Sequence, residues 1–373
     1  MSDGAVPYVD LAAQHRSIRA ELLAAIGGVL DSGQFVLGEA VSEFERRFAE
    51  LCDVPFAVGV NSGTDALILA LKAVGVGASD EVITVPNSFV ASTTCIRLLG
   101  ARPVFVDVRT DYNIDPTKIT GAITPRTKAI LPVHLTGRPC DMAPVLEIAK
   151  EHGLHVIEDC AQAVAAEYQG QRVGSFGAVG CFSLHPLKTL NACGDGGMLT
   201  TKDPELYERL RIMRNIGLRT RDDCVTWSSN SRLDSIQAAI LLVKLRYLDE
   251  WTERRRENAR YYMSRLGGIP RLQVPTDDPH VKAVYHTFVV QAESRDELRK
   301  YLEERGIGSA VHYPVPIHLT TAGRELGYPE WSFPVAEEQA RRVLSLPVYP
   351  ELLQWQLDRV CQTIREFYGV SQA

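Results

Sequence analysis

The chain has little of what marks metal, membrane or secreted proteins. None of its eight cysteines forms a CxxC pair or has metal-ligand spacing with a histidine, so we expect no metal site. No uninterrupted apolar run approaches membrane-spanning length, and no secretory signal is visible. Several cysteines lie in or beside apolar runs, which is typical of reduced, buried thiols. These features predict a cytoplasmic protein without a membrane anchor.

A basic block is also missing. The formal net charge is −6, which argues against nucleic-acid binding. The one short basic cluster, residues 254–256, lies in a helical stretch with acidic residues on both sides, and this pattern predicts a solvent-exposed helix face. Apolar residues make up 45% of the 373 residues and charged residues 23%. These values are those of a globular protein with room for a large domain and a smaller one.

Short apolar runs alternate with helical segments between residues 55 and 201. Because seven strands are joined by helical crossovers, the pattern predicts an α/β fold with a mainly parallel seven-stranded sheet sandwiched by helices. In such a sheet, ligands bind beyond the carboxyl ends of the strands. The predicted strands cover residues 55–60, 81–85, 103–108, 129–134, 155–159, 178–184 and 198–201.

The segments on either side of this alternation are mostly helical. Amphipathic helices over residues 8–31 and 39–51 pack either on the main domain or on a partner chain. Residues 233–266 predict one long helix, which joins a large domain, residues 1–248, to a smaller C-terminal α+β domain, residues 249–373. The elements predicted in the smaller domain are strands over residues 285–291 and 307–312, and helices over residues 295–305, 336–342 and 354–368.

Residues 181–190 place one lysine in apolar surroundings. A strand-like run ends at Ser183, a turn then carries Lys188, and a glycine-rich segment follows at residues 194–197. Apolar neighbours exclude water, which lowers the pKa of a lysine and frees its amine to act as a nucleophile. The alternative is an ordinary surface lysine in a loop.

A possible anion site follows the first predicted strand, which runs directly into Gly63 and Thr64, where a helix begins. Glycine permits close approach of the backbone, and the free amides of the first helical turn favour an anion such as phosphate. The Thr64 hydroxyl adds a further donor. A simple helix N-cap accounts for the same residues without a ligand.

Two acidic residues, Glu158 and Asp159, end the strand predicted over residues 155–159. An unpaired buried carboxylate is costly, so each needs a partner. Because side chains alternate along a strand, the two carboxylates face opposite sides of the sheet and have different roles. A protonated heterocyclic nitrogen would satisfy Asp159, and a helix N-cap is the alternative.

Taken together, these strand ends converge on one crevice. Pyridoxal 5'-phosphate requires an anion site, a carboxylate for its pyridinium nitrogen and a lysine for its Schiff base, and the three strand ends supply all of these. Phe89, which follows the strand over residues 81–85, supplies a ring to stack on the pyridine, or it is a core phenylalanine.

At these residues the sequence resembles the fold-type I, pyridoxal-phosphate-dependent sugar aminotransferases of the DegT/DnrJ/StrS family. The resemblance covers nearly the whole chain and is most specific in residues 62–67, 158–163, 174–188 and 230–234. It implies the fold-type I aminotransferase architecture. It also implies transfer of an amino group from an amino acid, expected to be L-glutamate, to a keto-sugar that is expected to carry a nucleotide.

The resemblance implies a role for each matching residue near the cofactor. Lys188 forms the Schiff base and moves the proton during transfer, while Asp159 keeps the pyridine nitrogen protonated. Gln162 hydrogen-bonds the phenolic oxygen of the cofactor. The residues that hold the phosphate are Gly63, Thr64 and Ser183.

Other matching positions point to a partner subunit and to the substrate. Asn230 matches the asparagine that reaches the phosphate of the neighbouring subunit, which implies a homodimer with shared active sites. Tyr313 and His318 match a loop near the substrate. One departure from the family pattern is the turn over residues 185–187, where His185 either contacts substrate or shapes the turn, and we favour the second interpretation.

Three alternatives to a nucleotide-sugar aminotransferase stay open. A related sugar dehydratase would use the same cofactor, but those enzymes replace the Schiff-base lysine with histidine. Cyclitol ketones (inososes) are also acceptors in this family. A non-catalytic regulatory homologue would keep the fold without the reaction, because fold does not fix function; against it, every chemical position is filled.

Overall fold

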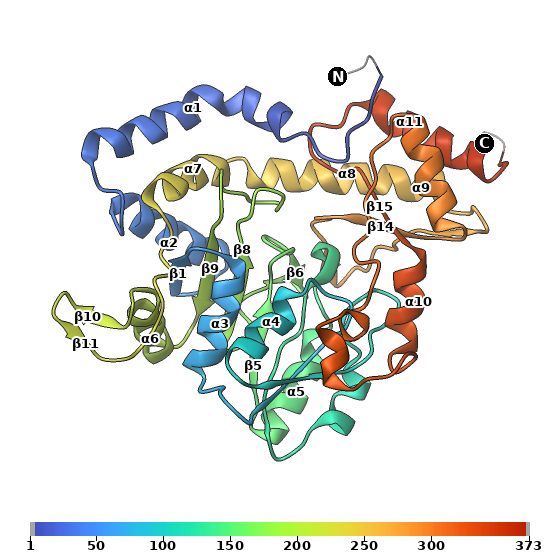
Figure 1. Ribbon diagram of the computed structural model, residues 1–373. Coiled ribbons are helices and arrows are strands. Elements are labelled where there is room, and N and C mark those ends of the chain that lie inside the picture. The colour runs from blue at the N-terminus through green and yellow to red at the C-terminus, as the bar shows by residue number, and fades with distance from the viewer. Residues whose placement is uncertain (1–3, 371–373) are drawn as a thin grey trace.

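A seven-stranded sheet forms the centre of the structure, a computed structural model that describes residues 4–370 (Figure 1). The strand order is β1-β9-β8-β5-β4-β2-β3. The sheet is parallel from β8 to β3, whereas β9 runs antiparallel to both of its neighbours. The predicted α/β fold with a mainly parallel seven-stranded sheet is therefore confirmed. The strands are β1 (Phe56–Val60), β2 (Glu81–Thr84), β3 (Arg102–Phe105), β4 (Thr127–Ile130), β5 (His155–Asp159), β8 (Val179–Ser183) and β9 (Gly197–Thr201).

The direction of β9 follows from the connection that precedes it. Residues 184–196 join β8 to β9 without a helix, whereas a parallel neighbour is usually reached through a helical crossover. The two strands pair antiparallel, with Ser183 opposite Gly197 and Gly180 opposite Thr200. The loop that carries Lys188 therefore begins and ends on the same side of the sheet, at the carboxyl end of β8 and the amino end of β9.

Helices connect and cover these strands. Every residue of β2, β8 and β9 is buried, so both faces of the sheet are covered. On one side Phe48 contacts Phe182 edge to face, with ring centroids 4.9 Å apart. Burial of each such side chain stabilises the fold by about 1.5–3 kcal/mol. The helices around the sheet are α2 (Glu39–Leu51), α3 (Gly63–Ala73), α4 (Ala91–Leu98), α5 (Met142–His152), α6 (Pro204–Arg214) and α7 (Ser235–Leu245).

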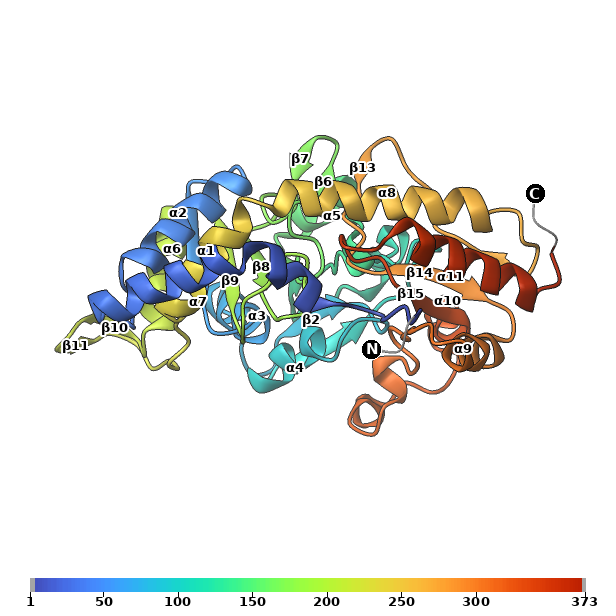
Figure 2. The same ribbon diagram turned by 90° about the horizontal axis from the view of Figure 1, so that it is seen from above.

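The first helix, α1 (Leu11–Ser32), lies along α7 (Figures 1 and 2). Ile18 and Leu22 pack with residues of α7 in one apolar cluster. Leu23 and Leu30 of the same helix point elsewhere and are 50% and 58% exposed. The helix therefore packs on the main domain of its own chain, which was one of the two predicted arrangements. Its exposed apolar side chains, Leu23 and Leu30, lie outside this contact.

The long helix predicted over residues 233–266 is wrong in one respect, because the structure divides it into α7 and α8 (Leu248–Leu266). The amides of Arg246 and Tyr247 bond to carbonyls three residues back instead of four, which tightens the turn. The Tyr247 hydroxyl then bonds Glu21 of α1 at 2.5 Å. The break thus lets α7 follow α1 while α8 runs on toward the C-terminal part of the chain (Figure 2).

The C-terminal part holds a smaller antiparallel sheet in the order β12-β14-β15. Its apolar core includes Val6, so the N-terminal segment packs here as well. The strand predicted over residues 307–312 is wrong: Ile307 pairs singly with Val6, and Ala310 pairs singly with Ser345. The two pairings lie on different neighbours, so no ladder extends. The elements are β12 (Leu272–Gln273), β14 (Phe288–Ala292), α9 (Arg295–Glu304), α10 (Pro334–Arg342), β15 (Val343–Leu346) and α11 (Gln354–Phe367).

Two smaller groups of strands complete the fold. In one, β13 (Val281–Lys282) pairs with β6 (Glu167–Tyr168), which also pairs with β7 (Gln171–Arg172). In the other, β10 (Leu218–Thr220) and β11 (Asp223–Cys224) form a hairpin that projects from the body beside α6 (Figures 1 and 2). Within residues 4–370 no helix combines the length and the apolar character needed to cross a bilayer.

Candidate active site

A cavity of about 430 Å³ lies beyond the carboxyl ends of the central strands. It collects residues from the loops after β1, β2, β5 and β8, together with residues of the C-terminal part. All but two of the predicted site residues line it: Gly63, Thr64, Phe89, Asp159, Gln162, Ser183, His185, Lys188 and Tyr313. The strand-end rule therefore located the cavity correctly.

At one end of the cavity, the first residue of α3 lies close to the last residue of β8. The Ser62 hydroxyl accepts the Asp65 amide at 3.1 Å, which starts the helix with the amides of Gly63 and Thr64 in its first turn, where no intrahelical acceptor is available. A side chain at Gly63 would meet the Ser183 Cβ at 2.6 Å. Only glycine fits here, and the Ser183 hydroxyl lies beside first-turn amides that favour an anion.

Asp159 ends β5 and is only 4% exposed. Its carboxylate accepts the Ser92 hydroxyl at 2.7 Å and the Ala161 amide at 3.1 Å. Burial raises the pKa of Asp159 above its usual value, although these hydrogen bonds and Lys188 oppose the shift. A buried carboxylate that two neutral donors hold still lacks a full positive charge, and a protonated ring nitrogen in the cavity would supply it.

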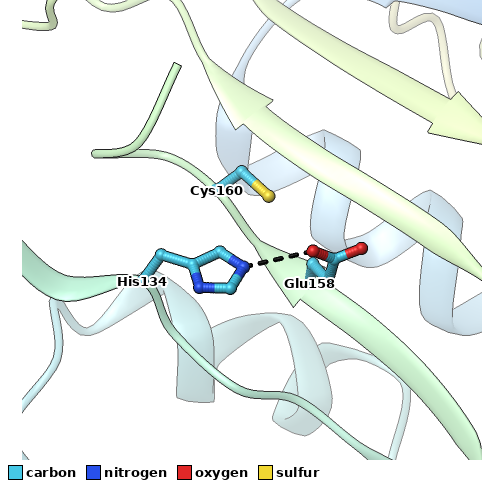
Figure 3. A group of neighbouring side chains, drawn as sticks. All are labelled: His134, Glu158 and Cys160. Atoms are coloured by element: carbon cyan, nitrogen blue, oxygen red, sulfur yellow. Dashed lines mark hydrogen bonds and ion pairs between the residues drawn. The ribbon is translucent and has the colours of Figure 1, made fainter. Parts of the chain in front are cut away.

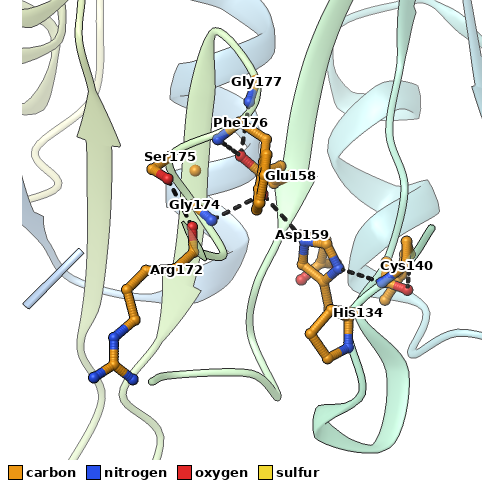
Figure 4. Close-up of polar contacts among 12 residues, drawn as sticks. His134, Cys140, Glu158, Asp159, Arg172, Gly174, Ser175, Phe176 and Gly177 are labelled. Atoms are coloured by element: carbon orange, nitrogen blue, oxygen red, sulfur yellow. Dashed lines mark hydrogen bonds and ion pairs between the residues drawn. The ribbon is translucent and has the colours of Figure 1, made fainter. Parts of the chain in front are cut away.

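Glu158 points to the other side of β5, as the alternation predicted. Its carboxylate accepts the amides of Gly174, Phe176 and Gly177, each at 2.8 Å (Figure 4). Glu158 therefore fixes the turn before β8, which in turn carries Ser183. The two adjacent acids differ as expected, because one holds the backbone and the other faces the cavity.

Three buried side chains next to this turn, those of His134, Glu158 and Cys160, offer ligand atoms within 4.8 Å of one another (Figure 3). The Cys140 amide donates to Nδ1 of His134 at 2.9 Å, and Nε2 of the same ring lies 3.2 Å from the Glu158 carboxylate. Since Nδ1 accepts, Nε2 carries the proton and donates it to Glu158. Both ring nitrogens are thus engaged, and the geometry assigns this group to the support of β5.

Lys188 lies in the loop between β8 and β9 and lines the cavity. Burial lowers its pKa to about 8, and the nearby Asp159 carboxylate opposes this shift. His185 shapes the turn before it: its Nδ1 accepts the Leu187 amide at 3.3 Å and its carbonyl accepts the Lys188 amide at 2.9 Å. His185 also lines the cavity, so the structure supports the turn interpretation without removing the residue from the site.

Gln162, Tyr313 and Phe89 form another side of the cavity. The Gln162 side-chain oxygen accepts the Thr136 amide at 2.7 Å, and its nitrogen lies 3.4 Å from the Tyr313 hydroxyl. The rings of Phe89 and Tyr313 are 5.9 Å apart. Phe89 precedes α4 instead of opening it and is 53% exposed, so the alternative of a core phenylalanine is wrong.

Two predicted site residues do not line the cavity. His318 is fully buried, with Nε2 3.1 Å from the Glu337 carboxylate and its ring against Phe333, so the expectation of a substrate contact is corrected. The chain turns back into a short 3-10 helix over Ile317–Leu319, which carries the imidazole into the protein. Asn230 is exposed and pairs through its backbone with Asn215, outside the cavity of its own chain.

Other cavity residues were missed, and Arg255 is the clearest case. The sequence interpretation placed residues 254–256 on a solvated helix face, yet Arg255 is only 6% exposed and lines the cavity. Helical spacing could have indicated that Arg255 is buried. Four buried residues follow one another at steps of three and four: Trp251, Arg255, Ala259 and Tyr262. Ser62 and Asp195 also line the cavity and lie in segments that the sequence analysis singled out, residues 62–67 and 194–197. The other missed polar residues have no distinctive motif: Tyr8, Ser88, Ser92, His286, Thr287, His312 and Tyr349.

The residues fit pyridoxal 5'-phosphate. An anion cradle at Gly63 and Ser183, a buried carboxylate at Asp159 and an amine of lowered pKa at Lys188 share one cavity. These are the three groups that the cofactor needs for its phosphate, its ring nitrogen and its aldehyde.

Known proteins support the same conclusion. The model of the DegT/DnrJ/EryC1/StrS aminotransferase family matches residues 16–365. A dTDP-3-amino-3,4,6-trideoxy-alpha-D-glucose transaminase of Streptomyces venezuelae is 48% identical over 363 residues, which cover 97% of this chain and 96% of that protein. A UDP-N-acetyl-3-dehydro-alpha-D-glucosamine 3-aminotransferase of Acidithiobacillus ferrooxidans is 44% identical over 97% of both chains.

Solved structures agree in fold. The crystal structure of S. venezuelae DesV in complex with a ketimine intermediate superimposes with a TM-score of 0.96 at 47% identity, covering 99% of this chain and 100% of that one. The chain therefore belongs to the DegT/DnrJ/EryC1/StrS aminotransferase family of pyridoxal-phosphate-dependent sugar transaminases, as its motifs predicted.

Proposed function

We propose that the protein transfers the amino group of L-glutamate to the keto carbon of a nucleotide-linked keto-sugar. The observation that carries this proposal is the single cavity in which Lys188 and Asp159 lie with the anion cradle at Gly63. The relatives that match over nearly their whole length act, by their names, on dTDP-linked and UDP-linked sugars. These names support a substrate that carries a nucleotide, and the assay below identifies the sugar.

Each residue then has a task that its surroundings suit. Bound pyridoxal phosphate supplies an electron sink for the carbon that loses or gains the amino group. The Lys188 amine, with a pKa of about 8, both holds the cofactor and takes up or returns a proton near neutral pH. Asp159 keeps the proton on the ring nitrogen, since the buried carboxylate gains a cationic partner there.

The remaining predicted residues orient and bind. Gln162 is fixed by the Thr136 amide and by the Tyr313 hydroxyl, and the second N–H of its side chain would donate to the phenolic oxygen of the cofactor. Thr64 and Ser183 would hold the phosphate with hydroxyl donors. His185 and Tyr313 lie at the cavity wall, where the keto-sugar would approach.

An amino-transfer assay tests this function. Purified holoprotein is incubated with L-glutamate and a panel of dTDP- and UDP-linked keto-sugars and inososes, and 2-oxoglutarate formation is measured. We expect 2-oxoglutarate and an aminated nucleotide sugar in equal amounts. Release of water from the keto-sugar without net amino transfer would instead establish the dehydratase, activity with inososes alone would establish a cyclitol aminotransferase, and silence across the whole panel would favour a regulatory homologue.

We also propose a homodimer with shared active sites. Exposed apolar side chains support an interface between two subunits. They are Leu23 and Leu30 of α1, and Trp227, which follows the β10–β11 hairpin and is 87% exposed. Asn230 follows in the same exposed stretch. Since Asn230 stands outside the cavity of its own chain, it is available to the site of a second subunit.

Mixing two impaired variants tests whether each active site is built from residues of both subunits. We expect Asn230→Ala and Lys188→Ala proteins to be impaired separately, and their mixture, after exchange of subunits, to recover roughly a quarter of wild-type activity. Half of the randomly formed dimers are hybrids, and each hybrid has one site with both native residues. A mixture that exchanges subunits but recovers nothing, or an active monomer by light scattering, contradicts the proposal.

Free thiols support a cytoplasmic location, which we also propose. All eight cysteines are free in the structure, and six of them are buried. Burial raises the pKa of the Cys160 and Cys181 thiols well above the usual value, so these thiols stay protonated and unreactive. A reducing compartment suits such a protein.

A further inference from the structure

The wall of the cavity contains a buried cation with no counter-charge in contact, Arg255 of α8. The side chain is 6% exposed. Within residues 4–370, no carboxylate oxygen lies within 4.0 Å of its guanidinium. One Nη donates to the Tyr285 carbonyl at 3.5 Å, which is the limit of a hydrogen bond, and the buried Nε has no partner. A guanidinium offers five N–H donors, so most of them are left for a ligand.

The electrostatics agree with this geometry. Burial lowers the pKa of Arg255 to about 10, and the more distant Glu351 and Tyr8 only partly oppose the shift. A buried charge without a counter-charge is strongly unfavourable. A protein that keeps one at the wall of a binding cavity gains its compensation when an anion binds.

Two cavity residues near Arg255, His286 and Thr287, are polar, uncharged and also incompletely bonded. Buried Nδ1 of His286 and Oγ1 of Thr287 have no hydrogen-bond partner in the described part of the chain, and both residues line the cavity. Burial lowers the pKa of His286 well below its usual value and lowers that of His312, so both imidazoles are neutral at pH 7. Arg255 and Lys188 are thus the strongly basic side chains among the described residues that line the cavity.

We propose that Arg255 binds a carboxylate of the amino-acid donor and, with the polar groups of His286 and Thr287, forms a donor subsite separate from the phosphate cradle. The planar fork of arginine pairs with a carboxylate through two parallel hydrogen bonds. One guanidinium balances one monoanion, whereas a diphosphate would bring at least two negative charges to a wall that offers one cation. The inference rests on the proposed function, since it assumes an amino-acid donor.

Binding of glutarate, an unreactive dicarboxylate, to the holoenzyme tests the subsite by calorimetry. Because hydrogen bonds to a charged group contribute strongly, we expect Arg255→Met to raise the glutarate Kd by about 10- to 100-fold. Arg255→Lys keeps the charge but loses the fork, so its Kd should lie between the two. Arg254→Met is the matched control, because Arg254 is an exposed neighbour that pairs with Glu250 on the same helix, and its Kd should equal that of the wild type.

Single-turnover reactions identify which carboxylate is bound. Equal slowing of the reactions with L-glutamate and L-glutamine in Arg255→Met assigns the α-carboxylate, and slowing with L-glutamate alone assigns the side-chain carboxylate; either result supports the subsite. An unchanged glutarate Kd in Arg255→Met overturns the proposal. So does weaker binding of dTDP with glutarate binding intact, since the ligand would then be a phosphate.

Stability separates a binding role from a structural one. We expect the unfolding temperature of cofactor-free Arg255→Met to equal or exceed that of the wild type, because the substitution removes an uncompensated buried charge. A large decrease would show that Arg255 mainly supports the fold, which would contradict the subsite. Glutarate binding does not require turnover. A wild-type protein that binds glutarate but transfers no amino group from L-glutamate to any keto-sugar would therefore refute the proposed function and leave the carboxylate site standing.

Discussion

Lys188→Met is expected to abolish amino transfer and, at the same time, to stabilise the protein without its cofactor. Methionine is unbranched and close to lysine in length, so it fills the same space between β8 and β9 without an amine. Loss of the group that holds the cofactor and moves the proton should lower the turnover rate on the order of 10⁴-fold or more. Single-turnover bleaching of the cofactor band by L-glutamate measures the chemical step directly.

The stabilising effect follows from the pKa of Lys188, which falls from 10.5 to about 8 on folding. Between these values the unfolded chain binds more protons than the folded chain, so stability rises with pH across this window and the penalty is complete below about pH 8. Because the side chain is half-buried and partly screened, we expect the variant to gain about 1–3 kcal/mol at pH 7. The gain should vanish near pH 10.5, as urea unfolding at several pH values would show.

Lys202→Met provides the matched control, because Lys202 is exposed just after β9. We expect this variant to keep wild-type turnover and to show the wild-type dependence of stability on pH. Amino transfer at an undiminished rate by the Lys188→Met protein would refute the assignment of the reacting amine. A stability gain at pH 7 that persists unchanged at pH 10.5 would refute its electrostatic explanation.

The sequence placed the candidate site residues correctly in the cavity where they lie at or just after the end of a buried strand. Gly63 comes shortly after β1, whereas Asp159 and Ser183 end β5 and β8, and at least four of the five residues in each strand are buried. Parallel strands bring their carboxyl ends to one side of the sheet, where ligands bind. Strand alternation also separated Glu158 from Asp159 correctly. Local patterns suffice here because the sheet geometry converts sequence position into spatial position.

Prediction failed where a residue reaches the site from a distant element. Arg255 lies on a helix whose charged neighbours hide its buried stripe, and it meets the cavity only because α8 packs across the C-terminal part. His318 shows the opposite error, since its loop lies near the site while its ring turns inward to Glu337. Side-chain direction in loops depends on tertiary packing, which spacing does not encode.

The antiparallel direction of β9 had a signal in the sequence, whereas the break in the long predicted helix had none. The thirteen residues between β8 and β9 contain one proline, two glycines and no helical pattern, which favours an antiparallel neighbour. The break at Arg246 and Tyr247, by contrast, replaces bonds within a continuous apolar stripe and has no proline or glycine to mark it. Only the contact of Tyr247 with Glu21, more than two hundred residues away, explains it.

Asp159→Asn should separate catalysis from stability in the same protein. Asparagine keeps the shape, and its oxygen can still accept the Ala161 amide, while Ser92 can turn its hydroxyl toward Ser88. Without the carboxylate, the proton on the ring nitrogen loses its buried counter-charge, which is worth about 3–5 kcal/mol and should slow transfer at least about 10²-fold. The pH dependence of the absorption band of the bound cofactor reports the lost proton independently of turnover.

The stability of the cofactor-free variant should change in the opposite direction to its activity. Burial raises the pKa of Asp159 above 3.8, so the folded chain binds more protons than the unfolded chain and wild-type stability falls as pH rises through that window. Asp159→Asn escapes this loss and should be more stable than the wild type at pH 7, with the difference disappearing toward pH 4. Glu158→Gln is the adjacent control. Its NH2 group would replace one carboxylate oxygen and turn donors toward either the Gly174 amide or the amides of Phe176 and Gly177, which should cost about 3 kcal/mol or more. Equal destabilisation by both substitutions would show that Asp159, like Glu158, serves mainly to hold the fold.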